Sequence, residues 1–141
     1  MSDLEKAKST LTNEGATLVA VKNGRIIFKT DLPGMRGLLQ AIENLKDGIY
    51  GASVADTVVG RAAGLLMVYS RVKDVYAAIL SEGGLKVLRE NKIGYEFGGI
   101  VPCILNESQT DLCPFEKLSL SIKSPAEAYQ ELRKLQESMA R

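Results

Sequence analysis

The sequence lacks histidine and tryptophan altogether, and its 141 residues include only two cysteines, Cys103 and Cys113. Without an imidazole there is no Ser-His-Asp or Cys-His catalysis, and most kinds of zinc site are excluded as well. Two cysteines do not make a disulfide framework, and they cannot alone complete a structural zinc site. We therefore expect a protein without bound metal whose thiols stay reduced, as in the cytoplasm.

Charge of one sign and long apolar runs are also missing. The 18 basic and 17 acidic side chains leave a formal charge of +1, so nothing favours a nucleic-acid partner. The longest apolar run, residues 62–69, is too short to span a bilayer, and the N-terminus has no apolar signal segment. These absences predict a soluble cytoplasmic protein with no membrane partner, and the length suits one domain over residues 1–141.

Local signals predict an alternation of helices and strands. Ser2 and Glu5 have the spacing of a helix capping box, and Asn23–Gly24 is the preferred pair for a tight hairpin turn between two β-rich runs. The continuous apolar run over residues 75–80 is typical of a parallel strand covered on both faces. Pro102 weakens a further strand within residues 98–105 or places it at an edge.

The remaining periodic segments predict helices. They cover residues 35–48, 59–70, 81–91, 113–118 and 124–139. A hairpin followed by βα crossovers implies a mixed sheet with helices on both faces. We therefore predict an α/β protein built as a three-layer α/β/α sandwich.

Two motifs carry a family resemblance. "ADTVVGRAAGLL" followed by "CPFE" resembles a small prokaryotic family of uncharacterised proteins with a cytidine deaminase-like fold, over about residues 4–118. In the deaminases, a buried helix opens with His-x-Glu and the next helix opens with Pro-Cys-x-x-Cys, which supply the zinc ligands and a general acid/base. Placed on residues 54–56 and 80–84, neither motif has its zinc ligands here. The resemblance thus implies the fold but not zinc-dependent deamination.

The resemblance also implies geometry. Two helices would begin at one end of the parallel strands, with free N–H groups directed into a shared pocket suited to anions or polar ligands. Asp56, at the expected mouth of the buried helix, is either a helix cap or a contact to a ligand, such as a ribose hydroxyl. Arg61 is either a solvated surface residue or a partner for phosphate in that pocket.

The second expected helix start lies at Ser81. Ser81 and Glu82 are either simple helix caps or part of the pocket lining, where Gly83 and Gly84 would let a ligand approach the backbone.

The segment from Cys113 to Glu116 is the remaining candidate. Cys113 with Pro114 fits the cap and first position of a helix, where unpaired N–H groups favour a reactive thiolate. Glu116 would bond the Cys113 N–H as half of a capping box. The alternative is a purely structural turn. Cys103 is expected in the buried core.

Three functions follow. The first is a zinc-free protein of deaminase-like fold that binds a nucleotide-like or ribose-phosphate molecule at the N-termini of two core helices. The second is a cysteine-dependent, transferase-like enzyme with Cys113 as nucleophile and Glu116 or Asp56 as base. The third is a structural or interaction protein, and a homo-oligomer is left open because deaminase-like domains often assemble.

Overall fold

A computed structural model describes residues 1–139 of the chain. It contains six α-helices, one short 3₁₀-helix (η1) and five strands within that range. In chain order they are α1 (Asp3–Glu14), β1 (Leu18–Lys22), β2 (Arg25–Thr30), α2 (Met35–Leu45), η1 (Lys46–Ile49), β3 (Ser53–Val59), α3 (Arg61–Tyr69), β4 (Asp74–Ser81), α4 (Glu82–Glu90), β5 (Gly94–Val101), α5 (Pro114–Ser119) and α6 (Pro125–Met139).

The five strands form one mixed sheet in the order β2-β1-β3-β4-β5. β1 pairs antiparallel with both β2 and β3, whereas β3, β4 and β5 run parallel to one another. An N-terminal hairpin is thus joined to a parallel half built from βα crossovers. The mixed sheet predicted from the sequence is confirmed.

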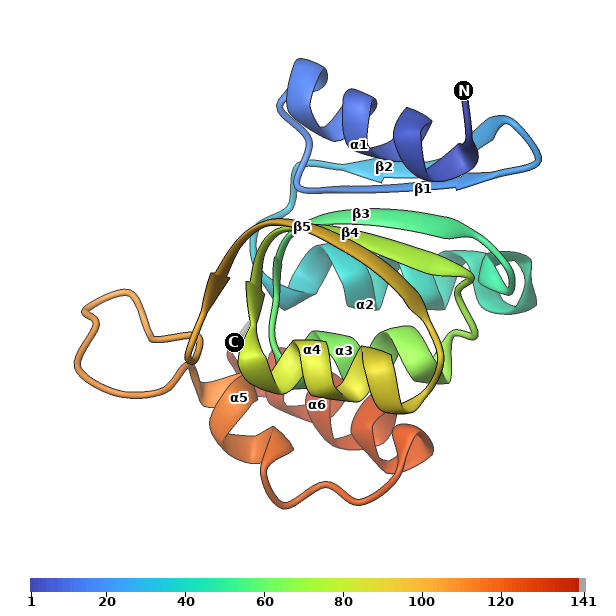
Figure 1. Ribbon diagram of the computed structural model, residues 1–141. Coiled ribbons are helices and arrows are strands. Elements are labelled where there is room, and N and C mark those ends of the chain that lie inside the picture. The colour runs from blue at the N-terminus through green and yellow to red at the C-terminus, as the bar shows by residue number, and fades with distance from the viewer. Residues whose placement is uncertain (140–141) are drawn as a thin grey trace.

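Helices cover both faces of this sheet. α1 lies alone on one face, while α2, α3 and α4 lie on the other, with α5 and α6 packed beneath them (Figure 1). The buried apolar residues divide accordingly into a large cluster on the multi-helix face and a small one under α1. The three-layer α/β/α arrangement is confirmed.

The N-terminal signals act as expected. The Ser2 hydroxyl accepts a hydrogen bond from the Glu5 N–H at 3.1 Å and begins α1. Asn23 and Gly24 adopt positive φ angles of 53° and 78° in the hairpin turn. The Asp3 carboxylate accepts hydrogen bonds from both turn N–H groups at 3.0 and 2.9 Å, so the start of α1 holds the tip of the hairpin.

One central strand was not predicted. Residues 53–59 were expected to lead directly into a helix, but they form β3 in the middle of the sheet. The strand signal of this segment is weak, because Ala55 and Asp56 are of residue types depleted in strands. Ala55 is fully buried in the cluster under α1. The small side chains thus suit a strand that is covered closely on both faces.

The later elements follow the predicted order with shifted bounds. β5 begins at Gly94, earlier than expected, and ends at Val101 directly before Pro102, which lacks the N–H that a ladder needs. It lies at the edge of the sheet, as predicted. Ser124 begins α6, where its hydroxyl accepts from the Glu127 N–H at 3.2 Å.

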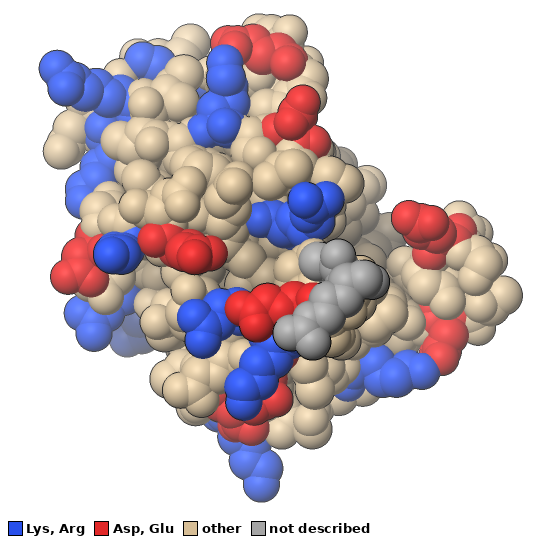
Figure 2. All heavy atoms as spheres, turned by 180° about the vertical axis from the view of Figure 1, so that it is seen from behind, with Lys and Arg blue, Asp and Glu red and all other residues tan. Residues whose placement is uncertain are grey.

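Basic and acidic side chains lie interspersed over the face of the molecule seen in Figure 2. No helix within the described part of the chain is long and apolar enough to cross a membrane.

Candidate functional site

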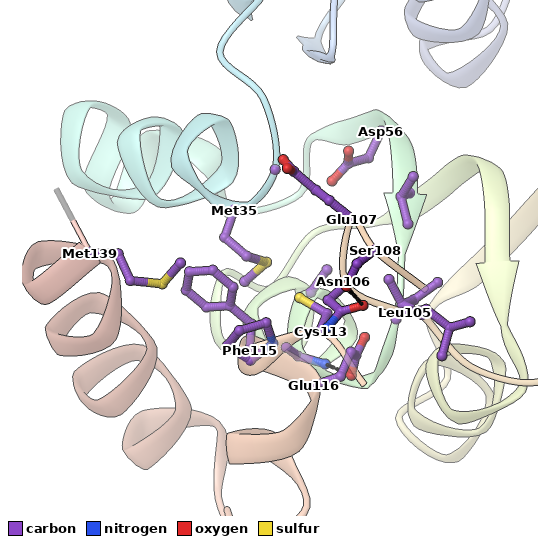
Figure 3. A pocket seen from close by; sticks show the side chains of 17 residues that line it. Met35, Asp56, Leu105, Asn106, Glu107, Ser108, Cys113, Phe115, Glu116 and Met139 are labelled. Carbon is purple, nitrogen blue, oxygen red and sulfur yellow. Dashed lines mark hydrogen bonds between the residues drawn. The ribbon is translucent and has the colours of Figure 1, made fainter. Parts of the chain in front are cut away.

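A cavity of about 690 Å³ lies at the carboxyl end of β3. Helix starts and the loop that follows β5 enclose it (Figure 3). Its lining is mostly apolar, with a few polar groups. The lining residues are Gly34, Met35, Asp56, Val58, Gly60, Ala62, Ala63, Ile104, Leu105, Asn106, Glu107, Ser108, Cys113, Pro114, Phe115, Glu116 and Met139.

Asp56 lies within β3 and reaches this cavity from the sheet. It pairs with Leu18 of β1 and Ala77 of β4, because β3 is the middle strand of the sheet. Alternation along the strand puts its side chain on the multi-helix face, where a core residue would normally be apolar. Only 7% of Asp56 is exposed. The sequence therefore places a carboxylate where most sheets place valine or leucine.

Burial raises the pKa of Asp56 from its ordinary value of 3.8 to about 7. Hydrogen bonds from the backbone N–H groups of Val58 and Thr57 lower it in part. No basic side chain lines the cavity within the described residues. A carboxyl group with such a pKa accepts or donates a hydrogen bond according to small changes in its surroundings.

The interpretation of Asp56 as a helix cap is wrong. α3 begins at Arg61, and its N-cap is Gly60, whose conformation is extended and which has no side chain to offer. Asp56 sits four residues earlier, in the strand. The error follows from the missed strand, because residues 54–59 were taken as the approach to a helix.

Glu116, from α5, caps α3 instead. The Ala62 N–H donates to Glu116 Oε2 at 3.2 Å, and the Ser119 hydroxyl lies 3.4 Å from the same oxygen. Burial raises the pKa of Glu116, while hydrogen bonds from Ala62, Ser119 and Arg61 oppose that rise. A Cβ on Gly60 would overlap Glu116 Oε1, so glycine at the N-cap makes room for a carboxylate 56 positions along the chain.

The local capping box predicted for α5 does not form. The Cys113 N–H donates to the Ile104 carbonyl at 3.0 Å rather than to Glu116. Cys113 is still the N-cap of α5, with Pro114 following, and it lines the cavity half-buried. The predicted core position of Cys103 is wrong, since this residue is exposed just after β5, where Pro102 has ended the strand.

Arg61 is neither a solvated surface residue nor part of the cavity lining, so both of its interpretations are wrong. It is partly buried, and its guanidinium donates to the carbonyls of Ser119 and Ile122 at 3.1 and 3.2 Å. These acceptors lie at the end of α5 and in the segment before α6, and Arg61 is not among the cavity-lining residues. The side chain therefore ties α3 to the C-terminal part of the chain.

The predicted glycines at the start of α4 also lie outside the cavity. Ser81 caps α4, with its hydroxyl accepting from the Gly84 N–H at 3.0 Å, so the capping alternative is the one observed. A Cβ on Gly84 would lie 2.8 Å from the Val59 carbonyl oxygen, which means that Gly84 serves packing of α4 against the end of β3. A Cβ on Gly83 would lie 3.5 Å from Arg61 Cβ, which is an ordinary contact, and neither Gly83 nor Glu82 lines the cavity.

The helices that begin at this cavity are α2, α3 and α5, and α4, which was predicted to begin there, does not. The shift by one helix is a consequence of the missed strand. The N-terminus of α2 enters the cavity through Gly34 and Met35, and Gly34 gives α2 no side-chain cap. Pro33–Gly34 before an apolar helix was the signal in the sequence that could have identified the start of α2 as part of the cavity wall.

When the two deaminase motifs are aligned with the starts of α2 and α3 instead, the zinc ligands are missing there too. The starts of these helices read Gly34-Met35-Arg36 and Gly60-Arg61-Ala62, without histidine or cysteine. Among residues 1–139, no group of three or more His, Cys, Asp or Glu side chains is placed to hold a metal ion. The acidic residues that line the cavity, Asp56, Glu107 and Glu116, are accompanied there by one thiol, Cys113, and by no histidine, which is not the set of nitrogen or sulfur ligands that zinc prefers.

Other lining residues had no distinct signal. Met35, Phe115 and Met139 gather on one side of the cavity, and Glu107 extends toward Asp56 from the loop after β5 (Figure 3). Single methionines, aromatics and loop carboxylates are too common in sequences to mark a site by themselves.

Comparisons with known proteins match most of the chain. The model of the domain of unknown function DUF1893, TM1506, matches residues 6–136. A DUF1893 family protein from Thermotoga maritima, TM1506, is 25% identical with a TM-score of 0.85, over 94% of this chain and 88% of that chain. No curated protein matches the sequence.

More distant structures show the fold alone. RibD from Acinetobacter baumannii is 17% identical with a TM-score of 0.52, and the match covers 68% of this chain and 35% of that chain. The match covers about a third of the RibD chain, and what the two proteins share is the α/β/α fold. Since the DUF1893 model spans nearly the whole sequence, the chain belongs to the DUF1893 family of domains of unknown function.

Proposed function

We propose that this protein binds a small nucleoside-like molecule in the cavity between the starts of α2 and α3, with Asp56 as its hydrogen-bonding anchor. The observation that carries the proposal is that Asp56, a residue only 7% exposed in the central strand, lies on the wall of a cavity of about 690 Å³. Such a group destabilises the fold when it is ionised without a partner. A ligand that bonds it offsets that cost.

The shape and chemistry of the lining support a flat, partly apolar ligand. Pockets for small molecules commonly have volumes of about 300–1,000 Å³ and apolar walls with a few polar groups. Here Met35 and Phe115 offer apolar surface, and Asn106 and Ser108 offer polar groups beside them. A nucleobase suits the apolar wall, and a base N–H or ribose O–H suits the Asp56 carboxylate.

The charges favour a nucleoside over the ribose phosphate that the sequence suggested. Every charged residue in the described lining is acidic: Asp56, Glu107 and Glu116. A phosphate would be repelled by these carboxylates. Its one favourable contact would be the uncapped start of α2 at Gly34. We therefore narrow the predicted ligand class from nucleotides to neutral nucleosides and related heterocycles.

A thermal-shift panel of nucleosides and their 5′-monophosphates tests this proposal, followed by calorimetric titration of the compounds that stabilise the protein. Asp56→Ala should bind about ten- to a hundredfold more weakly, because one hydrogen bond to a charged group is worth about 1.5–3 kcal/mol. Asp31→Ala, at an exposed aspartate outside the cavity, is the matched control and should bind like the wild type.

The proposal fails if no nucleoside stabilises the wild type, or if Asp56→Ala binds as tightly as Asp31→Ala. Tighter binding of the monophosphates than of the nucleosides would restore the ribose-phosphate ligand and reject the narrowing by charge.

Thiol chemistry at Cys113 is the second candidate function, and one observation favours it. Cys113 lines the same cavity as Asp56, so a bound molecule would contact both residues. Glu116 is a weaker candidate for the base, because its carboxylate already caps α3. In this alternative Asp56 takes that role.

A further inference from the structure

The two edges of the sheet are protected very differently. β2 carries Arg25 and Lys29, and Lys29 forms an ion pair with Glu14 at 2.6 Å. The β1–β2 register also shifts between Ala20 and Val21. Basic side chains and register irregularities are the devices by which natural proteins keep edge strands from pairing with other chains.

β5 has neither device. It pairs with β4 in one unbroken register from Gly94 to Val101. Its one charged residue, Glu96, is already engaged by Lys8 of α1 at 2.7 Å. β5 forms the front edge of the sheet in Figure 1. Its outward N–H and C=O groups are thus available over eight residues, about 26 Å of strand.

Large apolar side chains accompany this open backbone. Tyr95 and Phe97 are 37% and 38% exposed, and Ile100 is 46% exposed. Their β4 partners, in contrast, are all buried. An exposed, regular and apolar edge of this length is a site for strand addition, since monomers otherwise avoid such edges.

We propose that a second copy of this chain adds to β5, antiparallel and across a two-fold axis, and so extends the two sheets into one. A two-fold axis perpendicular to the sheet keeps the same face of both sheets on the same side. Each β5 residue is therefore opposed by a residue whose side chain lies on the same face of the joined sheet. The sequence of β5 is complementary to itself under this operation when the axis passes through Gly98.

In that register Phe97 opposes Gly99 of the second copy, and Tyr95 opposes Val101. Aromatic side chains pack well over glycine and over β-branched neighbours in antiparallel pairs. Glu96 opposes Ile100, so the two Glu96 carboxylates do not face each other. The match of the strand with itself is the reason for choosing a second copy over a foreign peptide as the occupant.

Native mass spectrometry and light scattering of the purified full chain test the proposal. We expect a dimer for the wild type and a monomer for Phe97→Lys, because lysine at an edge opposes pairing. Ile26→Lys is the matched control, since Ile26 is a similarly exposed aliphatic residue on the opposite edge strand, and it should remain dimeric.

Tyr95→Lys provides a second disruption, and circular dichroism establishes that each variant is folded. A monomeric wild type at about 100 µM would overturn the proposal. So would a dimer that survives both β5 variants, or one that only Ile26→Lys disrupts. Open assemblies larger than a dimer would instead indicate β5 pairing with β2 of the next copy.

Discussion

Asp56 and Glu116 are two buried carboxyl groups on the wall of one cavity, and they differ in what surrounds them. The carboxylate of Glu116, from α5, lies at the start of α3, where the Ala62 N–H donates to it and Gly60 leaves room for it. Asp56 has only the N–H groups of its own strand. Burial raises the pKa of both groups, but a value as high as about 7 is reached at Asp56.

The difference separates a structural acid from a candidate functional one. A carboxylate at a helix N-terminus satisfies unpaired N–H groups and the helix dipole, so it stabilises the fold. A buried carboxylate without such a partner destabilises the fold. In the proposed function, a bound ligand offsets that cost at Asp56. Three changes test whether the two acids divide in this way.

The largest effect should come from Gly60→Ala. The new methyl group would occupy the place of Glu116 Oε1 and remove the cap from α3. Overpacking together with the lost cap should cost about 3–5 kcal/mol of unfolding free energy, measured by urea denaturation. The double variant Gly60→Ala/Glu116→Ala should cost less than the sum of the single changes, because the overlap with Glu116 requires both side chains. A closer contact with Ile104 Cγ1, at 2.9 Å from the new Cβ, remains in the double variant.

Gly48→Ala is the control for this change, since its Cβ would find Leu45 Cβ at 4.0 Å as the nearest atom. It should stay within about 1 kcal/mol of the wild type. If Gly60→Ala is as mild as Gly48→Ala, Glu116 does not cap α3 as described.

The next largest effect should be on how the unfolding free energy depends on pH, tested with Asp56→Asn. A carboxyl group whose pKa is higher in the folded state binds protons more tightly there, so stability falls as pH rises from about 4 to about 7. Asparagine has no titrating carboxyl group, so Asp56→Asn removes this fall in stability with rising pH. The unfolding free energy of Asp56→Asn relative to the wild type should therefore rise by about 2–3 kcal/mol between pH 5 and pH 8.

Urea denaturation at both pH values, with Asp31→Asn as an exposed control, measures this difference. A constant offset between Asp56→Asn and the wild type across the range would show that folding does not raise the pKa of Asp56.

The smallest effect concerns the thiols beside the two acids. Cys103 is exposed and Cys113 is half-buried in the cavity wall. Iodoacetamide should label Cys103 several times faster, and a nucleoside that binds should slow labelling of Cys113 only. Peptide mass spectrometry follows both sites. Faster labelling of Cys113 than of Cys103 would show an activated thiol and favour the cysteine-dependent enzyme.

Much of the architecture could be predicted because its causes are local. The caps at Ser2, Ser81 and Ser124, the turn at Asn23–Gly24 and the apolar run of β4 depend on residues near one another in the chain. Such signals act within one turn or one strand. The deaminase-like fold followed from the order of these elements together with two motifs.

The site could be predicted only in part. Asp56, Cys113 and Glu116 do line one cavity, as the sequence suggested. Ser81, Gly83, Gly84 and Arg61 do not, because the missed strand moved the expected pocket by one helix.

What the sequence alone determined, therefore, is the elements with strong local signals, β3 excepted, and the absence of histidine. The tertiary structure decided which helix starts meet, and it gave the cap of α3 to Glu116, 54 residues beyond Ala62. It also decided that Asp56 points into a cavity rather than at a helix end. The physical reason is that a carboxyl group has no fixed partner in the chain. Its role as cap or anchor depends on which distant N–H groups the packed fold brings within reach.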